Sequence, residues 1–417
     1  MQIVLFEDEL TPQLAPVALA KPTYAIGCAS FRLIDLVRGL GTVRCVLRPH
    51  LQGVEEAGGR APLSPPSLAG PVLLVNARLV PSMAAVAKLR ELIAAEGEAI
   101  VISGQSVAAA LLRRTLNVPT QENGAVDVAA LLDQVRRLGL PGVDAKLPLL
   151  EYPHDILRYH LEHFRDSLEF RLRDGYRQMS DGLFVAEGVT LGPNLATDAR
   201  NGPILIDAGA SLGPFCYLTG PVYVGPGARL IENAVLKDGV ALGERTKVGG
   251  EIEASIIEPL ANKQHHGFLG HSYVGSWVNL GAGTSNSDLK NTYGTVNLDY
   301  GGRKVPTGMQ FVGCFLGEYS KTAVNTGIFT GKTVGVCSMV YGYVTTNVPS
   351  FTNYARSFGQ VTESPVEVAV SVQARMFTRR GVAQRPCDVQ LLHDLYELTR
   401  TERTQFGEPL SIEPLSL

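Results

Sequence analysis

The stretch from Asn262 to Asn291 concentrates polar groups that could do chemistry. Three histidines, His265, His266 and His271, fall within seven residues, and a Gly-Ala-Gly-Thr turn follows at 281–284. A neutral imidazole can take a proton from an attacking amine. Backbone N–H groups at a tight turn can stabilise the oxyanion that forms during acyl transfer. The segment therefore predicts an acyl-transfer site, and the alternative is a solvated loop whose histidines have no chemical role.

A period of six residues surrounds this segment and indicates the elements that must position it. An aliphatic residue recurs at eight consecutive positions of one phase: Ile206, Leu212, Leu218, Val224, Leu230, Leu236, Leu242 and Val248. This period is typical of a parallel β-helix, in which each hexad forms one side of a coil. The pattern predicts a β-helix over 183–350. Its phase breaks near 251–262, where we expect a loop that leaves the coil.

The flanking regions have other patterns. Short apolar runs at 3–6, 71–75 and 100–102 alternate with helix-like stretches such as 81–96, which predicts an α/β domain with a parallel sheet. The expected organisation is an N-terminal domain over 1–154, a linker helix over 155–182, the β-helix over 183–350 and a helical tail over 351–417. Because a solenoid has exposed coil edges, we expect the tail to act as a cap.

Composition excludes several classes of function. The 417 residues carry a net charge of −3 without a Lys/Arg block, so nucleic acid is not an expected partner. No apolar run approaches the ~18 residues of a membrane span. The six cysteines stand singly, which favours buried thiols in a reducing compartment. Glu7 interrupts the N-terminus too early for a secretory signal. We therefore expect a soluble cytoplasmic protein with no membrane partner.

The polar segment resembles the C-terminal domain of the bifunctional UDP-N-acetylglucosamine pyrophosphorylase/glucosamine-1-phosphate acetyltransferases. The similarity is greatest to a variant bacterial branch and to archaeal sugar-1-phosphate nucleotidylyltransferases. It rests on His265-His-Gly-Phe-Leu-Gly270 and Val278-Asn-Leu-Gly-Ala-Gly-Thr284. The resemblance implies that His265 is the general base, that Asn279 contacts the sugar and that the Ala282 amide faces the thioester oxygen. It also implies a left-handed β-helix, acetyl-CoA as co-substrate and a homotrimer.

The chain departs from the family pattern at three substrate-binding positions. Phe268 replaces a tyrosine, and Asp288 replaces an asparagine. Glu253 stands where the family has a phosphate-binding lysine, a role for which Lys263 and Lys290 are the substitutes. His266 and His271 remain alternatives to His265 as the base. On the last helical stretch Arg375, Arg379 and Arg380 could reach CoA phosphates, although a solvated helix face explains them as well.

The N-terminal half resembles the family's Rossmann-like nucleotidyltransferase domain more loosely. That domain joins a sugar 1-phosphate to UTP with the help of Mg²⁺. Glu7 and Asp8, at a strand end, could hold this Mg²⁺, and Lys21, Arg32 and Arg78 are cations that could serve the triphosphate. Ordinary surface charges are the alternative reading of the three cations.

Together the two halves predict a bifunctional enzyme that supplies UDP-N-acetylglucosamine from a sugar 1-phosphate and UTP. Four other readings remain. One is a single-activity nucleotidyltransferase or acetyltransferase whose other site has decayed. A second is a sugar-phosphate-binding N-terminal half, and a third is a non-catalytic scaffold. The fourth is a γ-type carbonic anhydrase with zinc on three histidines, but no histidine lies between His163 and His265 to supply the upstream ligand.

Overall fold

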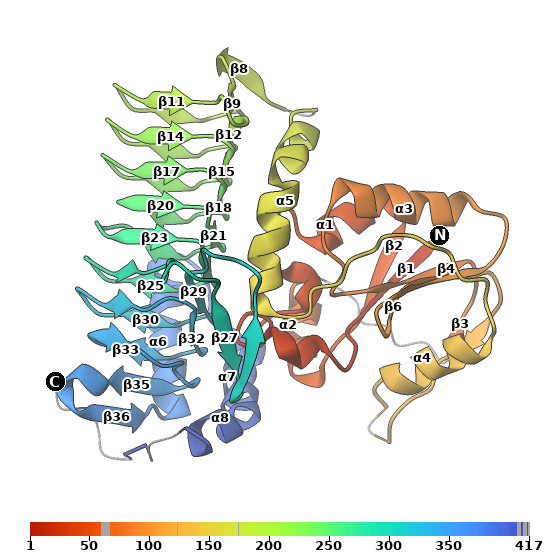
Figure 1. The fold of residues 1–417 in the computed structure, drawn as a ribbon. Helices are drawn as coiled ribbons and strands as arrows, with labels where there is room; N and C mark the ends of the chain where they lie inside the picture. Colours follow the sequence, from red (N-terminus) through yellow and green to blue (C-terminus); the bar gives the residue numbers. More distant parts are fainter. Residues whose placement is uncertain (60–66, 123, 174, 407–409, 412–414, 416–417) are drawn as a thin grey trace. The chain divides into compact units, whose positions relative to one another are not determined.

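The computed structural model of the chain describes residues 1–59, 67–122, 124–173, 175–406, 410–411 and 415. It divides into two compact units. Unit 1 comprises residues 1–14 and 21–152, and unit 2 comprises residues 15–20 and 153–417. Figure 1 labels their elements. No helix in the described part of the chain is both long and apolar enough to cross a bilayer.

Unit 1 is built on a five-stranded sheet in the order β2-β1-β4-β6-β5. The strands are β1 (Gln2–Phe6), β2 (Thr42–Val46), β4 (Val72–Asn76), β5 (Ala99–Ser103) and β6 (Ser106–Leu112). β1 lies parallel to β2 and β4, as predicted, but β6 runs antiparallel to both β4 and β5. The prediction of a parallel sheet therefore holds for β1, β2, β4 and β5 and is wrong for β6 alone among these five strands. Gly104, at φ +59°, turns the chain straight back, whereas a parallel neighbour would need a long crossover.

The helices of unit 1 cover this sheet. They are α1 (Leu33–Val37), α2 (Pro49–Ala57), α3 (Met83–Ala94) and α4 (Val128–Arg137), with short 3-10 turns at Thr11–Leu14, Thr23–Ala25 and Arg38–Leu40. A small ladder pairs β3 (Ser67–Leu68) with β7 (Leu116–Asn117). The predicted helix over 81–96 is confirmed as α3, whose N-cap Ser82 accepts a hydrogen bond from the Ala85 amide at 3.1 Å.

The β-helix of unit 2 has three faces, and the strands of each stack in parallel (Figure 1). The first face contains β8 (Arg177–Ser180), β9 (Leu183–Val185), β12 (Ile204–Ile206), β15 (Val222–Val224), β18 (Val240–Leu242), β21 (Ile256–Ile257), β24 (Tyr273–Val274), β29 (Cys314–Leu316) and β32 (Lys332–Val334). The second face contains β10 (Thr190–Leu191), β13 (Ser211–Leu212), β16 (Arg229–Leu230), β19 (Lys247–Val248), β22 (Asn262–Lys263), β25 (Asn279–Leu280), β30 (Lys321–Thr322), β33 (Met339–Val340), β35 (Thr352–Ala355) and β36 (Gln360–Glu363). The third face contains β11 (Ala196–Asp198), β14 (Tyr217–Thr219), β17 (Val235–Lys237), β20 (Glu251–Glu253), β23 (Phe268–Gly270), β26 (Ser285–Asn286), β31 (Gly327–Ile328) and β34 (Tyr343–Val344). Only β8 and β36, at the two ends of these stacks, pair antiparallel to their neighbours among the strands described here.

The aliphatic ladder predicted from the six-residue period is confirmed. Leu212 faces Leu230, and Leu230 faces Val248, so a full coil takes 18 residues. The inward residues of the three faces merge into one buried core. Sequence and register agree because the dry interior of the coil requires one inward apolar side chain on each face, which is one in every six residues.

The phase break near 251–262 is not a loop that leaves the coil. Val248 faces Lys263, so this coil is simply three residues shorter and its strands stay in the ladder. The excursion comes later, at 289–311, between Asp288 and Val312, whose amide bonds the Asp288 carbonyl at 2.8 Å. It carries an antiparallel hairpin of β27 (Asn297–Tyr300) and β28 (Arg303–Pro306).

Four helices flank the coils. α5 (Pro153–Arg171) runs along the first face (Figure 1), where Phe164 and Leu168 pack against Leu205 and Tyr223. The predicted helical C-terminal end is confirmed as α6 (Val366–Arg379), α7 (Pro386–Leu398) and α8 (Arg400–Thr404). α6 contacts the coils through Phe377, whose ring lies 4.4 Å from that of Trp277.

A buried histidine joins α5 to the coils and predicts a pH dependence. His160 is fully buried, and its Nε2 lies 2.9 Å from the Gly239 carbonyl oxygen. Burial lowers the pKa of His160 to about 4, against an unfolded value of 6.5. Between these values the unfolded chain binds the extra proton, so stability is complete above pH 6.5 and falls as the pH drops toward 4. The loss from this one group reaches about 3 kcal/mol.

Urea unfolding of wild type and His160→Gln at several pH values measures this effect. The glutamine amide can still donate to Gly239 but does not titrate. We expect the variant to lose less stability than wild type between pH 6.5 and 4.5. Equal losses in the two proteins would contradict the assignment.

Candidate active site

The Gly281–Thr284 turn forms a corner between the second and third faces. Three of its four amides are engaged: Gly281 donates to Thr322 at 3.1 Å, Gly283 to His266 at 3.0 Å, and Thr284 to Gly281 at 3.1 Å. The Ala282 N–H has no hydrogen-bond acceptor among the described residues. The amide of Val324, one coil on, is open in the same way. An N–H without an acceptor therefore occurs at more than one of these corners. Whether such an N–H can take part in catalysis depends on the side chains around it.

His265 and His266 occupy the same corner one coil earlier. Asn262 faces Asn279, and this register places His265 opposite Ala282 and His266 opposite Gly283. Both imidazoles are exposed. His266 reaches over the turn, since its Nε2 would lie 3.3 Å from a Cβ at Gly283. The structure thus brings two candidate bases to the corner that carries the open amide.

His271 lies at a different corner, between the third and first faces. Its Nδ1 is 2.9 Å from Asp288 Oδ2, and its ring stacks on Phe311 at 5.2 Å between centroids. His271, Asp288 and Phe311 therefore meet where the 289–311 excursion leaves the coil. The contact between His271 and Asp288 stabilises the point where the excursion leaves the coil. The Asp288 carboxylate is therefore bonded there and does not face the Gly281–Thr284 turn.

The other predicted substrate-binding residues are dispersed. Phe268 lies on β23 of the third face, where its amide donates to Ser285 Oγ at 3.1 Å. Lys290 lies in the excursion, and its Nζ donates to the Thr295 carbonyl at 2.9 Å. Lys263 points into the coil, where it is 1% exposed and bonds two backbone carbonyls. The expected phosphate contact of Lys263 does not fit this position, because the amine cannot reach the surface without breaking both bonds.

A cluster of five cations that sequence reasoning did not assemble lies on the second face. Arg229 and Lys247 project from neighbouring strands, and Arg245 lies at the corner that precedes β19. Arg379 is the last residue of α6, and Arg380 is its C-cap. None of the five pairs with a carboxylate of the described residues. Burial lowers the pKa of Lys247, and the charges of Arg380, Arg379 and Arg229 lower it further. The 18-residue spacing of Arg229 and Lys247 was the available signal, but only the fold brings α6 over them.

A chain of hydrogen bonds joins this cluster to the predicted sugar contact. Arg380 Nη2 donates to Asn262 Oδ1 at 2.7 Å, and Asn262 Nδ2 donates to Asn279 Oδ1 at 3.2 Å. Asn279 in turn lies two residues before the Gly281–Thr284 turn. One continuous surface therefore holds cations, two amides and the open N–H of Ala282.

In unit 1, the predicted metal ligands lie at the carboxyl ends of the strands, as expected. Asp8 follows β1 and forms a buried pair with Arg78, which follows β4, at 2.6 and 2.7 Å. Asn76 donates to the same carboxylate at 2.8 Å. Burial raises the pKa of Asp8, but the hydrogen bonds and charge of Arg78 outweigh it, and the net pKa is lowered.

Glu7 is engaged in a similar way. Arg48 Nε donates to one of its oxygens at 3.0 Å, and the other accepts from Arg48 Nη2 and from the Thr23 amide at 2.8 Å. The described part of the chain holds no group of three or more side chains that could bind a metal. Glu7 and Asp8, as arranged, do not fit a Mg²⁺ site, because guanidinium groups already neutralise both carboxylates.

Two of the three predicted nucleotide-binding cations, Arg32 and Arg78, are paired with carboxylates. Arg78 is fully engaged, with Nη1 on the Leu150 carbonyl at 2.7 Å and Nη2 on Ser106 Oγ at 2.9 Å besides Asp8. Arg32 pairs with Asp35 at 2.7 Å. The Lys21 carbonyl accepts a hydrogen bond from Arg48 at 3.1 Å. The sequence placed Arg78 at the correct edge of the sheet, but its ion pair rules out an open triphosphate contact there.

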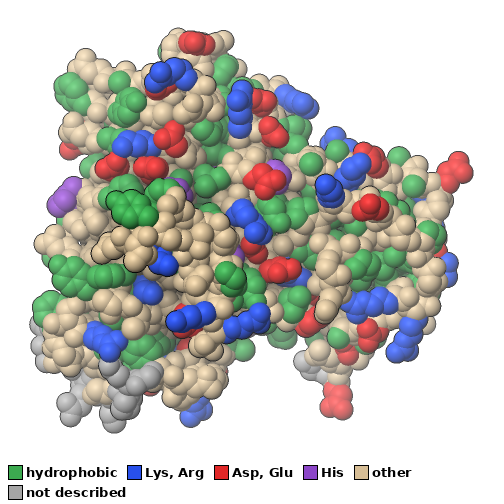
Figure 2. All heavy atoms as spheres, viewed as in Figure 1, with side chains coloured by type: hydrophobic (Ala, Val, Ile, Leu, Met, Phe, Trp, Pro, Cys, Tyr) green, Lys and Arg blue, Asp and Glu red, His purple; other side chains and the backbone are tan. Residues whose placement is uncertain are grey.

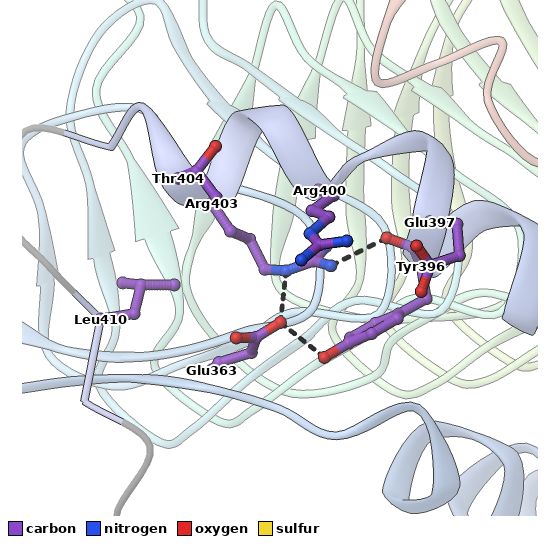
Figure 3. Close-up of a pocket in the computed structure, with 7 residues that line it drawn as sticks. All are labelled: Glu363, Tyr396, Glu397, Arg400, Arg403, Thr404 and Leu410. Atoms are coloured by element: carbon purple, nitrogen blue, oxygen red, sulfur yellow. Dashed lines mark hydrogen bonds and ion pairs between the residues drawn. The ribbon is translucent and has the colours of Figure 1, made fainter.

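A separate pocket of about 540 Å³ lies among the C-terminal helices (Figure 3). Arg403 and Tyr396 both donate to Glu363 Oε1, at 2.7 and 2.6 Å. None of the predicted site residues lines this pocket. Figure 2 shows that the face drawn there carries acidic and basic side chains interspersed, without a large patch of either sign.

Comparison with known proteins gives a family model and relatives that match parts of the chain. Residues 3–174 match the family model described as sugar nucleotidyl transferase. Over 111 residues, 26% of the chain, the protein is 28% identical to the bifunctional sugar-1-phosphate nucleotidylyltransferase/acetyltransferase of Sulfurisphaera tokodaii. Over 121 residues, 28% of the chain, it is 34% identical to the bifunctional protein GlmU of Cupriavidus pinatubonensis. The resemblance to the bifunctional family is confirmed.

The matches are partial. The chain spans 28% and 26% of the length of these two relatives of the bifunctional family. Among solved structures it is similar to the UDP-N-acetylglucosamine acyltransferase of Francisella novicida, at 12% identity and a TM-score of 0.36, with 56% of this chain and 79% of that one covered.

Proposed function

We propose that the protein is a bifunctional transferase of sugar-nucleotide biosynthesis in the cytoplasm. It transfers the acetyl group of acetyl-CoA to the amine of glucosamine 1-phosphate and joins the resulting sugar 1-phosphate to UTP. One observation carries the proposal: the open Ala282 amide lies opposite the exposed His265 in a chain whose other part matches a sugar nucleotidyl transferase. The two relatives named above are called bifunctional enzymes of this kind, which supports it.

The acetyl-transfer step follows from the corner. The acceptor amine attacks the thioester carbon, His265 takes the amine proton, and the Ala282 N–H donates to the oxygen that becomes negative. Collapse of the tetrahedral intermediate breaks the C–S bond, and the proton held by His265 passes to the departing CoA thiolate. The step uses the exposed imidazole of His265 and an amide N–H that is not bonded to any described residue.

The cation cluster supplies recognition of the acceptor phosphate. A phosphate bound by Arg380 and Lys247 would place the sugar over Asn262 and Asn279, toward the corner. This arrangement does not need the buried Lys263.

The cluster makes a prediction for the acceptor. We expect the double variant Lys247→Gln/Arg380→Gln to raise KM for glucosamine 1-phosphate about 10- to 100-fold, because charge-assisted bonds to phosphate are lost. KM for acetyl-CoA should change little. Arg165→Gln, which removes an exposed charge from α5, is the matched control. Equal KM for glucosamine 1-phosphate in the double variant and the control would show that Lys247 and Arg380 do not bind the acceptor phosphate.

A homotrimer completes the proposed site. The corner lies on the outer surface of the coil, so a second wall must come from elsewhere to exclude water from the reaction. Apolar side chains near this corner on the next coils support a subunit contact, since Val324 is 66% and Tyr343 62% exposed.

Thiol release from acetyl-CoA tests the acetyl-transfer half directly. We expect release that depends on glucosamine 1-phosphate and is much slower with glucosamine. No release with any amino-sugar phosphate would refute the acetyltransferase.

Pyrophosphate release from UTP tests the other half. A second candidate function for unit 1, a sugar-phosphate-binding domain without catalysis, is favoured by the Asp8–Arg78 and Glu7–Arg48 pairs, in which guanidinium groups already neutralise both carboxylates. Pyrophosphate release with N-acetylglucosamine 1-phosphate would exclude this candidate, and binding of that sugar without release would establish it.

A further inference from the structure

Lys263 occupies a rung of the coil interior that apolar side chains fill in the preceding coils. Its strand neighbour in register is Val248, and Leu230 precedes that. An ammonium group in such a core is costly to desolvate unless hydrogen bonds compensate it. The chain therefore retains a charge where an aliphatic side chain would be more stable, and the contacts of that charge indicate its use.

The contacts of Lys263 are two backbone carbonyls at one corner of the coil. Its Nζ donates to His265 at 2.6 Å and to Gly249, one coil earlier, at 3.2 Å. Gly250 has no side chain, and a Cβ there would lie 3.0 Å from both the ammonium nitrogen and the His265 oxygen. The corner therefore has room for the ammonium only because residue 250 is glycine. The ammonium links the His265 carbonyl to the Gly249 carbonyl of the preceding coil.

We infer that Lys263 is a positioning residue, which holds the His265–His266 corner at a fixed distance from the open amide of Ala282. The catalytic part of this inference rests on the proposed acetyl transfer, and the structural part does not. Burial lowers the pKa of Lys263 to about 8, so most of the side chains are still protonated at neutral pH. Without this hydrogen bond, the corner keeps its backbone hydrogen bonds between strands but loses the contact between the Lys263 ammonium and the His265 carbonyl oxygen.

Lys263→Met tests the inference, because methionine matches the chain length and restores an apolar rung. We expect its melting temperature to equal or exceed that of wild type. We expect kcat for acetyl transfer to fall about 10- to 100-fold, with KM for acetyl-CoA unchanged, since misplacement of a base affects the chemical step. Val248→Met, on the neighbouring rung, is the matched control and should leave kcat unchanged.

Amide hydrogen exchange gives a readout that does not depend on activity. The Gly283 amide bonds the His266 carbonyl, and the Phe268 amide bonds Ser285 Oγ, so both report on this corner. We expect both amides to exchange at least tenfold faster in Lys263→Met and at the wild-type rate in Val248→Met. Lys263→Leu repeats the test with the residue type that the ladder uses, should the methionine variant not fold.

The outcomes separate the two ideas. Wild-type kcat and wild-type exchange in the Lys263 variants would overturn the positioning role. Faster exchange in a protein whose wild type transfers no acetyl group would sustain the structural tie and refute the proposed function instead. Faster exchange with unchanged kcat would show that the tie exists but does not position the base, which also overturns the inference.

Discussion

Replacement of His265 by alanine is expected to lower kcat for acetyl transfer by about 10² to 10⁴, the usual contribution of a general base. His265 faces Ala282, whose N–H is open, whereas His266 faces Gly283, whose N–H is already bonded. In the proposed transfer the thioester carbonyl accepts from the open amide, so the base opposite that amide is the one expected to reach the attacking amine. KM for both substrates should stay within a few-fold of wild type.

Thiol release measured in parallel for His265→Ala, His266→Ala and His271→Ala checks this expectation. The His266 and His271 variants are the controls, and each should keep most of the wild-type rate. A large loss confined to His266→Ala would move the base by one residue. A loss confined to His271→Ala would instead assign the proton transfer to the pair with Asp288, at the other corner of the coil.

The largest expected effect on stability comes from the ion pair of unit 1. Arg78 is 1% exposed, and Asp8 is its only described carboxylate partner. Asp8→Asn leaves a buried guanidinium without a counter-charge, which costs about 3–5 kcal/mol. The double variant Asp8→Asn/Arg78→Met removes both charges and should recover most of that loss.

Hydrogen exchange of the slowest amides in β1 and β4 measures the free energy of unfolding of unit 1 separately from the coils. Because the Asp8 pKa is lowered in the folded state, the contribution of the pair is present above the unfolded pKa of 3.8 and is lost as the pH falls below it. Equal losses in the single and double variants would contradict the assignment, since an uncompensated charge would then not be the cause.

These two sites differ in how far the sequence could predict them. The acyl-transfer segment is predicted by its three histidines and its Gly-Ala-Gly-Thr turn, and the family resemblance singles out His265 and Ala282. The 17-residue register between the two neighbouring strands places these residues opposite each other. In unit 1 the sequence placed Glu7, Asp8 and Arg78 at strand ends but not their pairing. Asp8 and Arg78 are 70 positions apart, and no local pattern in the sequence indicates that they come into contact. Their ion pair occupies the carboxylate that was predicted to bind a metal.

The β-helix, its inward ladder and the helical C-terminal end could all be predicted from the sequence. For the β-helix the reason is that successive coils contact each other locally, so the residue spacing shows which positions stack. Only the tertiary structure decided the direction of β6, the shorter coil that turns Lys263 into the core, and the convergence of α6 with Arg229 and Lys247. Each of these depends on contacts between distant segments or on a small change of register. Contacts between distant segments and small changes of register produce no periodic pattern in the sequence, so they can be recognised only in the folded structure.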